Sequence, residues 1–453
     1  MGFSFDKEFE FKGEFWISSD SEKKVTGKLY YDYEEGIILT LNKEFPSNPT
    51  EVEIINGVKY GGQSLTLLNA IFTSSKGDFK GSYEVIYNCE FLLYGELFSQ
   101  EREMSFNKLS FGFTNLEEWF CHKPYEIVTN DNYEWSISNV YLPSKKIEIQ
   151  TGLNLKTNSS FTKNIKSKQE IDLSFRTYFT FEADSKITLE YYIEAIKLIQ
   201  NFLTLSMDSS CSTKFIKGLS QSDKFYGIDI VRGKSFENDY KKVHSHDMIL
   251  SYNDFNTKFE EVFINLFELK NKFESIVNLF TANYYKSDTY QELRFLNLTQ
   301  AFEAYFRLTK ETSYLPENEF DKFRRQIVDS LPKSKNISLN AKLKSIIKYA
   351  NEFSLRKKMK EFISSFEEDT IAFFGLDSSF IDKIVSTRNY YTHYDKSLKE
   401  DAEKGIELTK LEIKLRYILT LYLFRDLGLN ELFILEKIKK NKRASYFIKS
   451  SNG

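Results

Sequence analysis

The sequence predicts an α+β protein of more than one domain, in which a β-sandwich-like N-terminal part precedes an all-α helical bundle. Three observations predict this class. Up to about residue 185, apolar and polar residues alternate in short runs, as they do in half-buried strands. From about residue 256, apolar residues recur at helical spacing. The chain of 453 residues is also longer than the ~250–300 residues at which a single core stops growing.

Residues 1–185 are predicted to form a β-rich domain of short strands separated by turns. The segment 25–33 alternates apolar and polar residues, and a Glu-Glu-Gly turn leads from it into the apolar run 37–42. Asn56-Gly57 is typical of a two-residue hairpin loop between two further strands. The same pattern continues at 83–98 and 104–114.

A change of period marks the middle of the chain. Residues 187–207 have apolar side chains at helical spacing, whereas 224–236 and 247–255 are strand-like, so we expect a mixed connecting region at 186–255. We expect a helical domain at 256–453. Its predicted helices are 259–280, 292–308, 320–331, 340–353, 357–369, 378–391 and 403–427.

The composition is that of a folded protein with no membrane association. Hydrophobic residues make up 41% of the chain, and 42 Phe and 28 Tyr supply ample apolar area for cores. The first residues have neither the basic nor the apolar region of a signal peptide, and the apolar stretch 417–424 is far shorter than the ~20 residues that cross a bilayer. Three cysteines are too few for a disulfide framework. We therefore expect a cytoplasmic protein.

Charge is unevenly distributed along the chain. Residues 291–453 carry a formal charge of +7, which leaves −10 for residues 1–290 of a chain whose total is −3. A basic half permits a polyanionic partner, and the alternative is that these charges simply solvate helix faces. No phosphate-binding glycine motif is present, so we expect no nucleotide cofactor. The basic residues that we select as candidates for binding a polyanion are Lys357, Lys358, Lys360, Lys440, Lys442 and Arg443.

The sharpest local motif is Arg388-Asn389-Tyr-Tyr-Thr-His393, which closes a predicted helix with Ile381 and Ile384 on its apolar face. Arginine offers a permanent planar charge for a phosphate, and histidine is the side chain best suited to moving protons near neutral pH. If the helix continues, five residues turn ~500° and place His393 about 140° from Arg388. A helix that ends or loosens here would let both side chains face one cleft.

This arrangement resembles the HEPN superfamily, whose motif is an Arg, a polar residue, three to five further residues and a His. Arg388, Asn389 and His393 match that motif, with four residues between Arg and His. The segment 300–307 looks like the first helix of the ApeA-like HEPN group, in which Glu303 would be the acidic residue near the cleft. The segments 11–17, 25–41 and 116–120 look like the β-rich domain that precedes HEPN modules of the ApeA type.

The resemblance implies a metal-independent endoribonuclease of anti-phage defence, a toxin that acts by abortive infection. In such enzymes the RNA 2′-OH attacks the adjacent phosphorus and leaves a 2′,3′-cyclic phosphate. His393 would be the general acid or base, Arg388 would stabilise the phosphate, and Asn389 would bind the phosphate or fix the imidazole tautomer. It further implies an RNA substrate such as tRNA, a homodimer formed through the HEPN domain, no cofactor, and a phage-derived trigger on the N-terminal sensing domain.

Two alternatives remain open. The first is a non-catalytic HEPN-type binding or scaffold module, in which the motif merely caps a helix at a dimer interface. The second concerns a metal. Cys121, His122, His244 and His246 are all potential zinc ligands, although their spacing matches no known zinc finger, and we prefer surface or hydrogen-bonded histidines.

Overall fold

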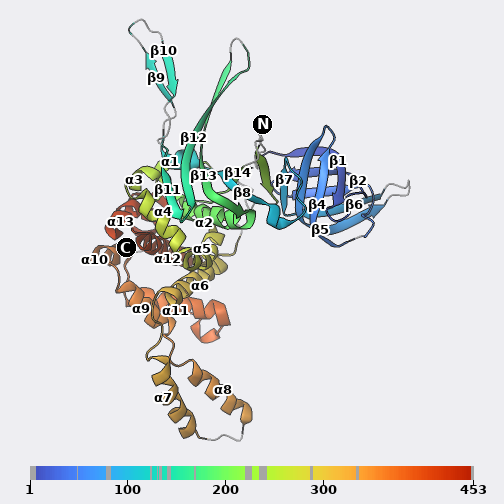
Figure 1. The fold of residues 1–453 in the computed structure, drawn as a ribbon. Helices are drawn as coiled ribbons and strands as arrows, with labels where there is room; N and C mark the ends of the chain where they lie inside the picture. The colour runs from blue at the N-terminus through green and yellow to red at the C-terminus, as the bar shows by residue number, and fades with distance from the viewer. Residues whose placement is uncertain are drawn as a thin grey trace. The chain divides into compact units, whose positions relative to one another are not determined.

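The structure is a computed structural model, in which the chain divides into two compact units, Met1–Phe267 and Glu268–Gly453. The first unit is β-rich and the second is helical, which confirms the predicted fold class (Figure 1). Each unit is described below by itself. The residues that the structure describes are 7–47, 49–77, 83–122, 125–129, 131, 135–139, 144–167, 170–219, 227–233, 242–285, 289–332 and 336–449.

Six antiparallel strands at the start of the first unit form a closed sheet. They follow one another in the order β5-β4-β1-β2-β3-β6, and β6 pairs back with β5 to complete the ring. Large side chains that point inward, such as Phe15, Tyr31 and Tyr87, are fully buried there. The strands are β1 (Phe9–Ile17), β2 (Val25–Asp32), β3 (Gly36–Leu41), β4 (Glu51–Lys59), β5 (Gln63–Gly77) and β6 (Tyr83–Cys89).

The hairpin predicted at Asn56-Gly57 is wrong, because both residues lie inside β4. The Asn56 amide is buried, donates to Phe98 O at 3.0 Å and accepts from the Thr66 hydroxyl at 2.9 Å. A Cβ on Gly57 would lie 2.7 Å from the Phe15 ring, so glycine is needed here for close packing. The turn comes later, where Gly61 and Gly62 both have positive φ.

The closed sheet continues into an open one through β7 (Phe91–Tyr94), which pairs with both β5 and β15. Within the described residues, thirteen strands thus belong to one sheet, and β9 (Tyr125–Thr129) and β10 (Trp135–Asn139) form a separate hairpin. The remaining strands follow β7 in the order β15 (Ile228–Arg232), β14 (Thr213–Leu219), β8 (Ser105–Phe113), β13 (Ile171–Thr188), β12 (Leu153–Ile165) and β11 (Lys146–Gln150).

The segment 186–255, which we expected to connect two domains, is integrated into the first unit. Its strands β14 and β15 pair with β8 and β7, and its long helix α2 (Leu189–Met207) packs on β8 and β13. Part of the strand predicted at 247–255 is instead the short helix α3 (Tyr252–Phe255), which begins with a capping box between Ser251 and Asp254. The unit also contains α1 (Leu116–Phe120) and the 3₁₀ turns Glu101–Glu103 and Ser245–Asp247.

The helix predicted at 259–280 is two helices, α4 (Phe259–Glu268) and α5 (Lys270–Tyr285), and the two units divide at the end of α4, between Phe267 and Glu268. The rings of Phe259 and Phe263 in α4 pack 4.4 Å apart, and Phe263 also contacts Phe179 and Phe202 of the first unit. The aromatic face of α4 therefore belongs to the β-rich unit, and the division falls later than the expected residue 256.

The second unit is a helical bundle around a buried helix, α12 (Gly405–Asp426). Helices α6 (Gln291–Thr309), α13 (Glu431–Lys440) and α14 (Lys442–Lys449) pack against it. Among the described residues, no helix is long and apolar enough to span a membrane. The other helices are α7 (Glu317–Ser330), α8 (Ile337–Lys348), α9 (Leu355–Ile363), α10 (Glu368–Phe374), α11 (Ser378–His393) and the 3₁₀ turn Lys396–Leu398.

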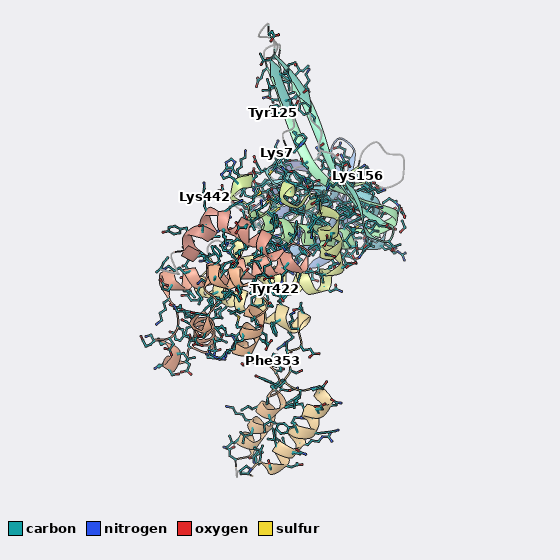
Figure 2. The ribbon with its side chains drawn as sticks, turned by 90° about the vertical axis from the view of Figure 1, so that its left-hand side faces the viewer. Lys7, Tyr125, Lys156, Phe353, Tyr422 and Lys442 are labelled. Carbon is teal, nitrogen blue, oxygen red and sulfur yellow. The ribbon has the colours of Figure 1, made fainter. Side chains whose placement is uncertain are left out.

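Helices α7 and α8 form an arm that extends away from the other helices of this unit, beyond Phe353 (Figure 2). The base of the arm is fixed by two backbone hydrogen bonds, from Tyr314 N to Asn351 O at 3.0 Å and from Phe353 N to Thr312 O at 2.7 Å. The Tyr314 and Phe353 rings stack edge to face across the same point. These contacts fix the two chain segments that join the arm to the bundle.

Candidate functional site

The candidate site is built on α11, whose sequence explains both of its ends. The Asp377 side chain accepts a hydrogen bond from Phe380 N at 2.9 Å and caps the N-terminus. Ile381 and Ile384 are buried, as the predicted apolar stripe requires. The helix continues through His393 and ends at Tyr394, which adopts a left-handed conformation with φ of 51°.

Arg388 is held in place by two neighbours. Its Nη2 lies 3.0 Å from Glu303 Oε1 on α6, and its Nη1 donates to Asn389 Oδ1 at 3.0 Å. The side chains of Arg388 and Glu303 are 29% and 25% exposed, so the pair is half-buried. The structure therefore brings together Arg388, Asn389 and Glu303, three of the residues selected from the sequence.

His393 lies apart from this cluster within one chain. Because α11 stays helical to its end, five residues carry His393 about 140° around the helix and roughly 7.5 Å along it from Arg388. The side chain is exposed at the helix end. Nearby, hydrogen bonds from the backbone and side chain of Ser397 hold the pKa of Asp395 below its usual range, and the charge of His393 adds to this effect.

The segment that follows α11 is tied back onto the helix by residues that sequence reasoning missed. Thr387 Oγ1 is buried and accepts from Glu403 N at 2.9 Å, and Tyr391 OH donates to Glu403 O at 3.2 Å. Lys383 Nζ lies 2.8 Å from a carboxylate oxygen of Glu403. Polar side chains such as Thr387 and Tyr391 on the face of a predicted helix indicate that another segment covers this face. The sequence does not indicate which segment it is.

The selected basic residues lie on three helices, α9, α13 and α14. Lys360 is exposed on α9, which packs on α11, and Lys357 on the same helix pairs with Glu361. Lys358 is only 3% exposed, which corrects our expectation that it lies on a binding surface. The other three are exposed on α13 and α14, which pack on α12; they are Lys440, Lys442 and Arg443.

The four candidate zinc ligands are not assembled into a site. Cys121 donates its S–H to Glu118 O at 3.3 Å, and the ring of His122 lies 5.8 Å from that of Phe175. The rings of His244 and His246 stack on each other at 5.5 Å. Within the described parts of the chain, no group of three or more His, Cys, Asp or Glu residues is placed to hold a metal ion.

The fold and the site together define a class of protein: a β-rich domain followed by a helical domain with an Arg-Asn-x₃-His motif at a helix end. Residues 10–266 match the family described as ApeA N-terminal domain 1, and residues 296–432 match the family described as Apea-like HEPN. The chain therefore belongs to the ApeA family, whose members join this N-terminal domain to an Apea-like HEPN domain.

This domain pair is typical of the HEPN proteins of anti-phage defence. HEPN domains are generally ribonucleases, and they typically bind RNA and dimerise. The comparison with curated proteins and the comparison with solved structures found no match to the chain.

Proposed function

We propose that the helical unit is a metal-independent endoribonuclease that acts in anti-phage defence by abortive infection, in the cytoplasm and without a cofactor. Arg388 and Asn389 bind the scissile phosphate, and His393 transfers protons. The observation that carries this proposal is the half-buried Arg388 guanidinium, which Glu303 and Asn389 orient on the helix that ends at the exposed His393.

The contacts of Arg388 leave room for a phosphate. A guanidinium has five N–H donors, and Glu303 and Asn389 use one donor each. The side chain of Arg388 is 29% exposed, so part of it is accessible from solvent. The two fixed contacts pre-organise the charge, so little reorganisation is needed when negative charge develops on the phosphate oxygens.

The reaction needs a base and an acid. A base takes the proton of the 2′-OH as the O2′–P bond forms, and an acid gives a proton to O5′ as the P–O5′ bond breaks, which yields a 2′,3′-cyclic phosphate and a 5′-OH. One His393 in each chain can take one of these two roles. We therefore propose a homodimer in which His393 of the partner subunit takes the other role, and in which Arg388 of one chain lies near the partner's His393.

We propose that substrate binding and control involve the rest of the chain. Exposed basic residues would bind the phosphates of an RNA backbone, for example that of tRNA. The −10 charge of residues 1–290 would repel these phosphates, so we do not expect the N-terminal region to bind RNA. That region would instead sense a phage component and restrain the toxic nuclease until the component binds. The basic residues that we assign to the RNA grip are Lys357, Lys360, Lys440, Lys442 and Arg443.

A second candidate function is a non-catalytic RNA-binding or scaffold module. The observation that favours it is the ion pair of Arg388 with Glu303, because a satisfied, half-buried pair can serve packing alone. The exposure of His393 argues against the scaffold function, because packing does not require a histidine at an exposed position. The two candidates differ in one outcome, which is whether RNA is cut.

The test is to incubate the purified full-length chain with total cellular RNA in the presence of EDTA and to sequence the RNA ends. We expect new 5′-OH ends and 2′,3′-cyclic phosphates at defined sites. RNA that is bound but remains intact would favour the scaffold. Cleavage that EDTA abolishes and magnesium or manganese restores would refute the metal-independent mechanism.

A further inference from the structure

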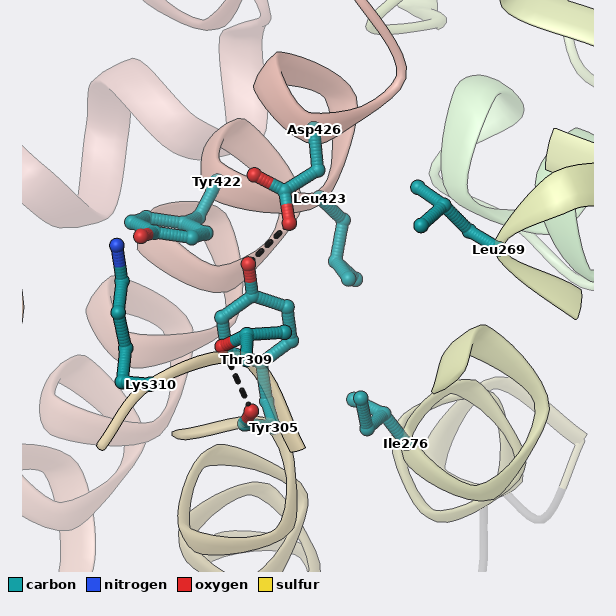
Figure 3. Close-up of a pocket in the computed structure, with 8 residues that line it drawn as sticks. All are labelled: Leu269, Ile276, Tyr305, Thr309, Lys310, Tyr422, Leu423 and Asp426. Atoms are coloured by element: carbon teal, nitrogen blue, oxygen red, sulfur yellow. Dashed lines mark hydrogen bonds between the residues drawn. The ribbon is translucent and has the colours of Figure 1, made fainter. Parts of the chain in front are cut away.

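The two helices of the arm bury few of their side chains. In the bundle, by contrast, Tyr305 of α6 and Tyr422 of α12 are buried, with their ring centroids 5.0 Å apart (Figure 3). In the arm, Phe320 is the one buried residue of α7, and α8 has none. Helices of this length, 14 and 12 residues, are marginally stable in water unless an apolar face packs on another surface. The arm therefore lacks the packing that stabilises the bundle.

The exposed side chains of α8 form one stripe along the helix. Successive members of the stripe are three or four residues apart, which places them on the same face. The members are Leu339, Lys342, Ile346 and Tyr349, and all four are exposed. The half-buried Leu343 lies on a neighbouring face, and α8 packs on α7. The stripe is thus apolar, apart from one lysine, and solvent contacts it.

The end of the arm that lies away from the bundle is apolar as well. Ile337 begins α8 there and is 83% exposed, and the ring of Phe323 on α7 is 51% exposed. Figure 2 shows that the arm extends away from the other helices of this unit, beyond Phe353. The exposed apolar side chains at this end can therefore reach a flat surface before the bundle does.

The same segment contains the basic excess of the helical unit. Residues 322–348 contain eight Lys and Arg residues and one acidic residue, Asp329, which gives a formal charge of +7. Residues 291–453 as a whole also carry +7, so the charges of the remaining residues in that range cancel. Three of these lysines, Lys342, Lys344 and Lys348, are exposed on α8. The arm is therefore both basic and apolar at its surface.

This combination matches an anionic lipid surface better than it matches RNA or a protein. Lysine and arginine contact the phosphates of RNA, and aliphatic side chains such as Ile346 add little to those contacts. Protein interfaces are depleted in lysine, whereas α8 exposes three lysines. In an amphipathic helix at a membrane, apolar side chains enter the acyl boundary and lysine stems extend the ammonium groups to the lipid phosphates.

We propose that the arm binds anionic lipid membranes, with Ile337, Leu339 and Ile346 at the acyl boundary and the lysines of α8 on the lipid phosphates. For a protein of the cytoplasm, this surface is the cytoplasmic leaflet, which contains anionic lipids. The proposal changes our expectation of no membrane association. That expectation rested on the lack of an apolar stretch long enough to span a bilayer, and a hairpin that lies on the surface needs none.

The test is co-sedimentation of the full-length chain with vesicles of phosphatidylcholine alone and of an equal mixture of phosphatidylcholine and phosphatidylglycerol. We expect binding to the mixed vesicles that weakens in high salt, and binding at least about tenfold weaker to phosphatidylcholine alone. Ile337→Ser and Lys342→Glu should each weaken binding to the mixed vesicles about tenfold. The matched controls Ile406→Ser and Lys399→Glu, at exposed positions outside the arm, should bind as the wild type does.

Thermal unfolding of each variant shows whether it folds, and Lys342→Glu keeps the proposal testable if Ile337→Ser does not. The proposal is overturned if the chain does not sediment with the mixed vesicles, if it binds both vesicle types equally, or if both arm variants bind as the wild type does. A chain that binds a labelled single-stranded RNA through Lys342 but binds no vesicle would assign the arm to RNA instead. His393→Ala should sediment as the wild type does, so the outcome is independent of the proposed cleavage.

Discussion

Glu303→Gln isolates the role of the ion pair that orients Arg388. The substitution keeps the shape and one acceptor oxygen of the side chain but removes its charge. Exposed ion pairs contribute about 0–1 kcal/mol and the loss of one partner of a fully buried pair costs about 3–5 kcal/mol, so a half-buried pair falls near 1–2 kcal/mol. If that energy holds the guanidinium toward the phosphate, the kcat for RNA cleavage should fall about tenfold.

The assay measures kcat and KM for a defined RNA. Glu352→Gln is the matched control, because Glu352 pairs with Arg307 of the same helix α6 through side chains that are 48% and 65% exposed. This control should leave kcat within twofold. Repeating Glu303→Gln in an Arg388→Lys background should produce a much smaller loss, since the oriented group is already changed. A kcat that is unchanged, or that falls equally in both backgrounds, would refute the positioning role of Glu303.

Tyr305→Phe removes the hydroxyl that donates to Asp426 and should lower the unfolding free energy of the helical unit by about 1–2 kcal/mol in urea denaturation, whereas Tyr349→Phe at an exposed position should not. The pKa of Tyr305 is raised above the ordinary 10.0, so above about pH 10 the folded chain keeps the phenol proton that the unfolded chain loses. The unfolding free energy should therefore decline as pH rises above about 10, and it should decline less in the Tyr305→Phe variant. Gly13→Ala would place a Cβ 2.4 Å from Val58 O and should destabilise the β-rich unit by about 1–3 kcal/mol, measured by its thermal unfolding. Light scattering should show that the active species is at least a dimer; a strictly monomeric active enzyme would contradict the composite cleft.

The period of the apolar residues predicted the fold class, because this period depends on which face of each helix or strand is buried. The buried face is a local property of the sequence, and the folded structure retains it. Turn chemistry was less reliable. Asn56-Gly57 has the composition of a hairpin loop, but the glycine is there because Phe15 of a neighbouring strand occupies the space of a side chain. The pairing of β14 with β8 joins residues about a hundred positions apart, so periodicity alone does not place the segment 186–255 in the first unit.

In the candidate site, residue spacing predicted the relative positions of side chains on one helix, but it did not predict the contacts between side chains of different helices. The angle between Arg388 and His393 follows from helix geometry alone. Glu303 is 85 residues from Arg388, and only the family resemblance pointed to it. The burial of Lys358 had a local signal, because Lys358 and the buried Phe362 are four residues apart and share a face of α9. The contact between Tyr305 and Asp426 had no local signal in the sequence.

The central claim is that His393 carries protons in RNA cleavage, and the rate of the His393→Ala variant tests it most directly. His393 is exposed at a helix end, so the substitution should leave thermal unfolding unchanged. We expect the cleavage rate of a defined RNA in EDTA to fall by about 10²–10⁴-fold, and added imidazole to restore part of it. A His393→Ala variant that cuts the same RNA at the wild-type rate would contradict the account.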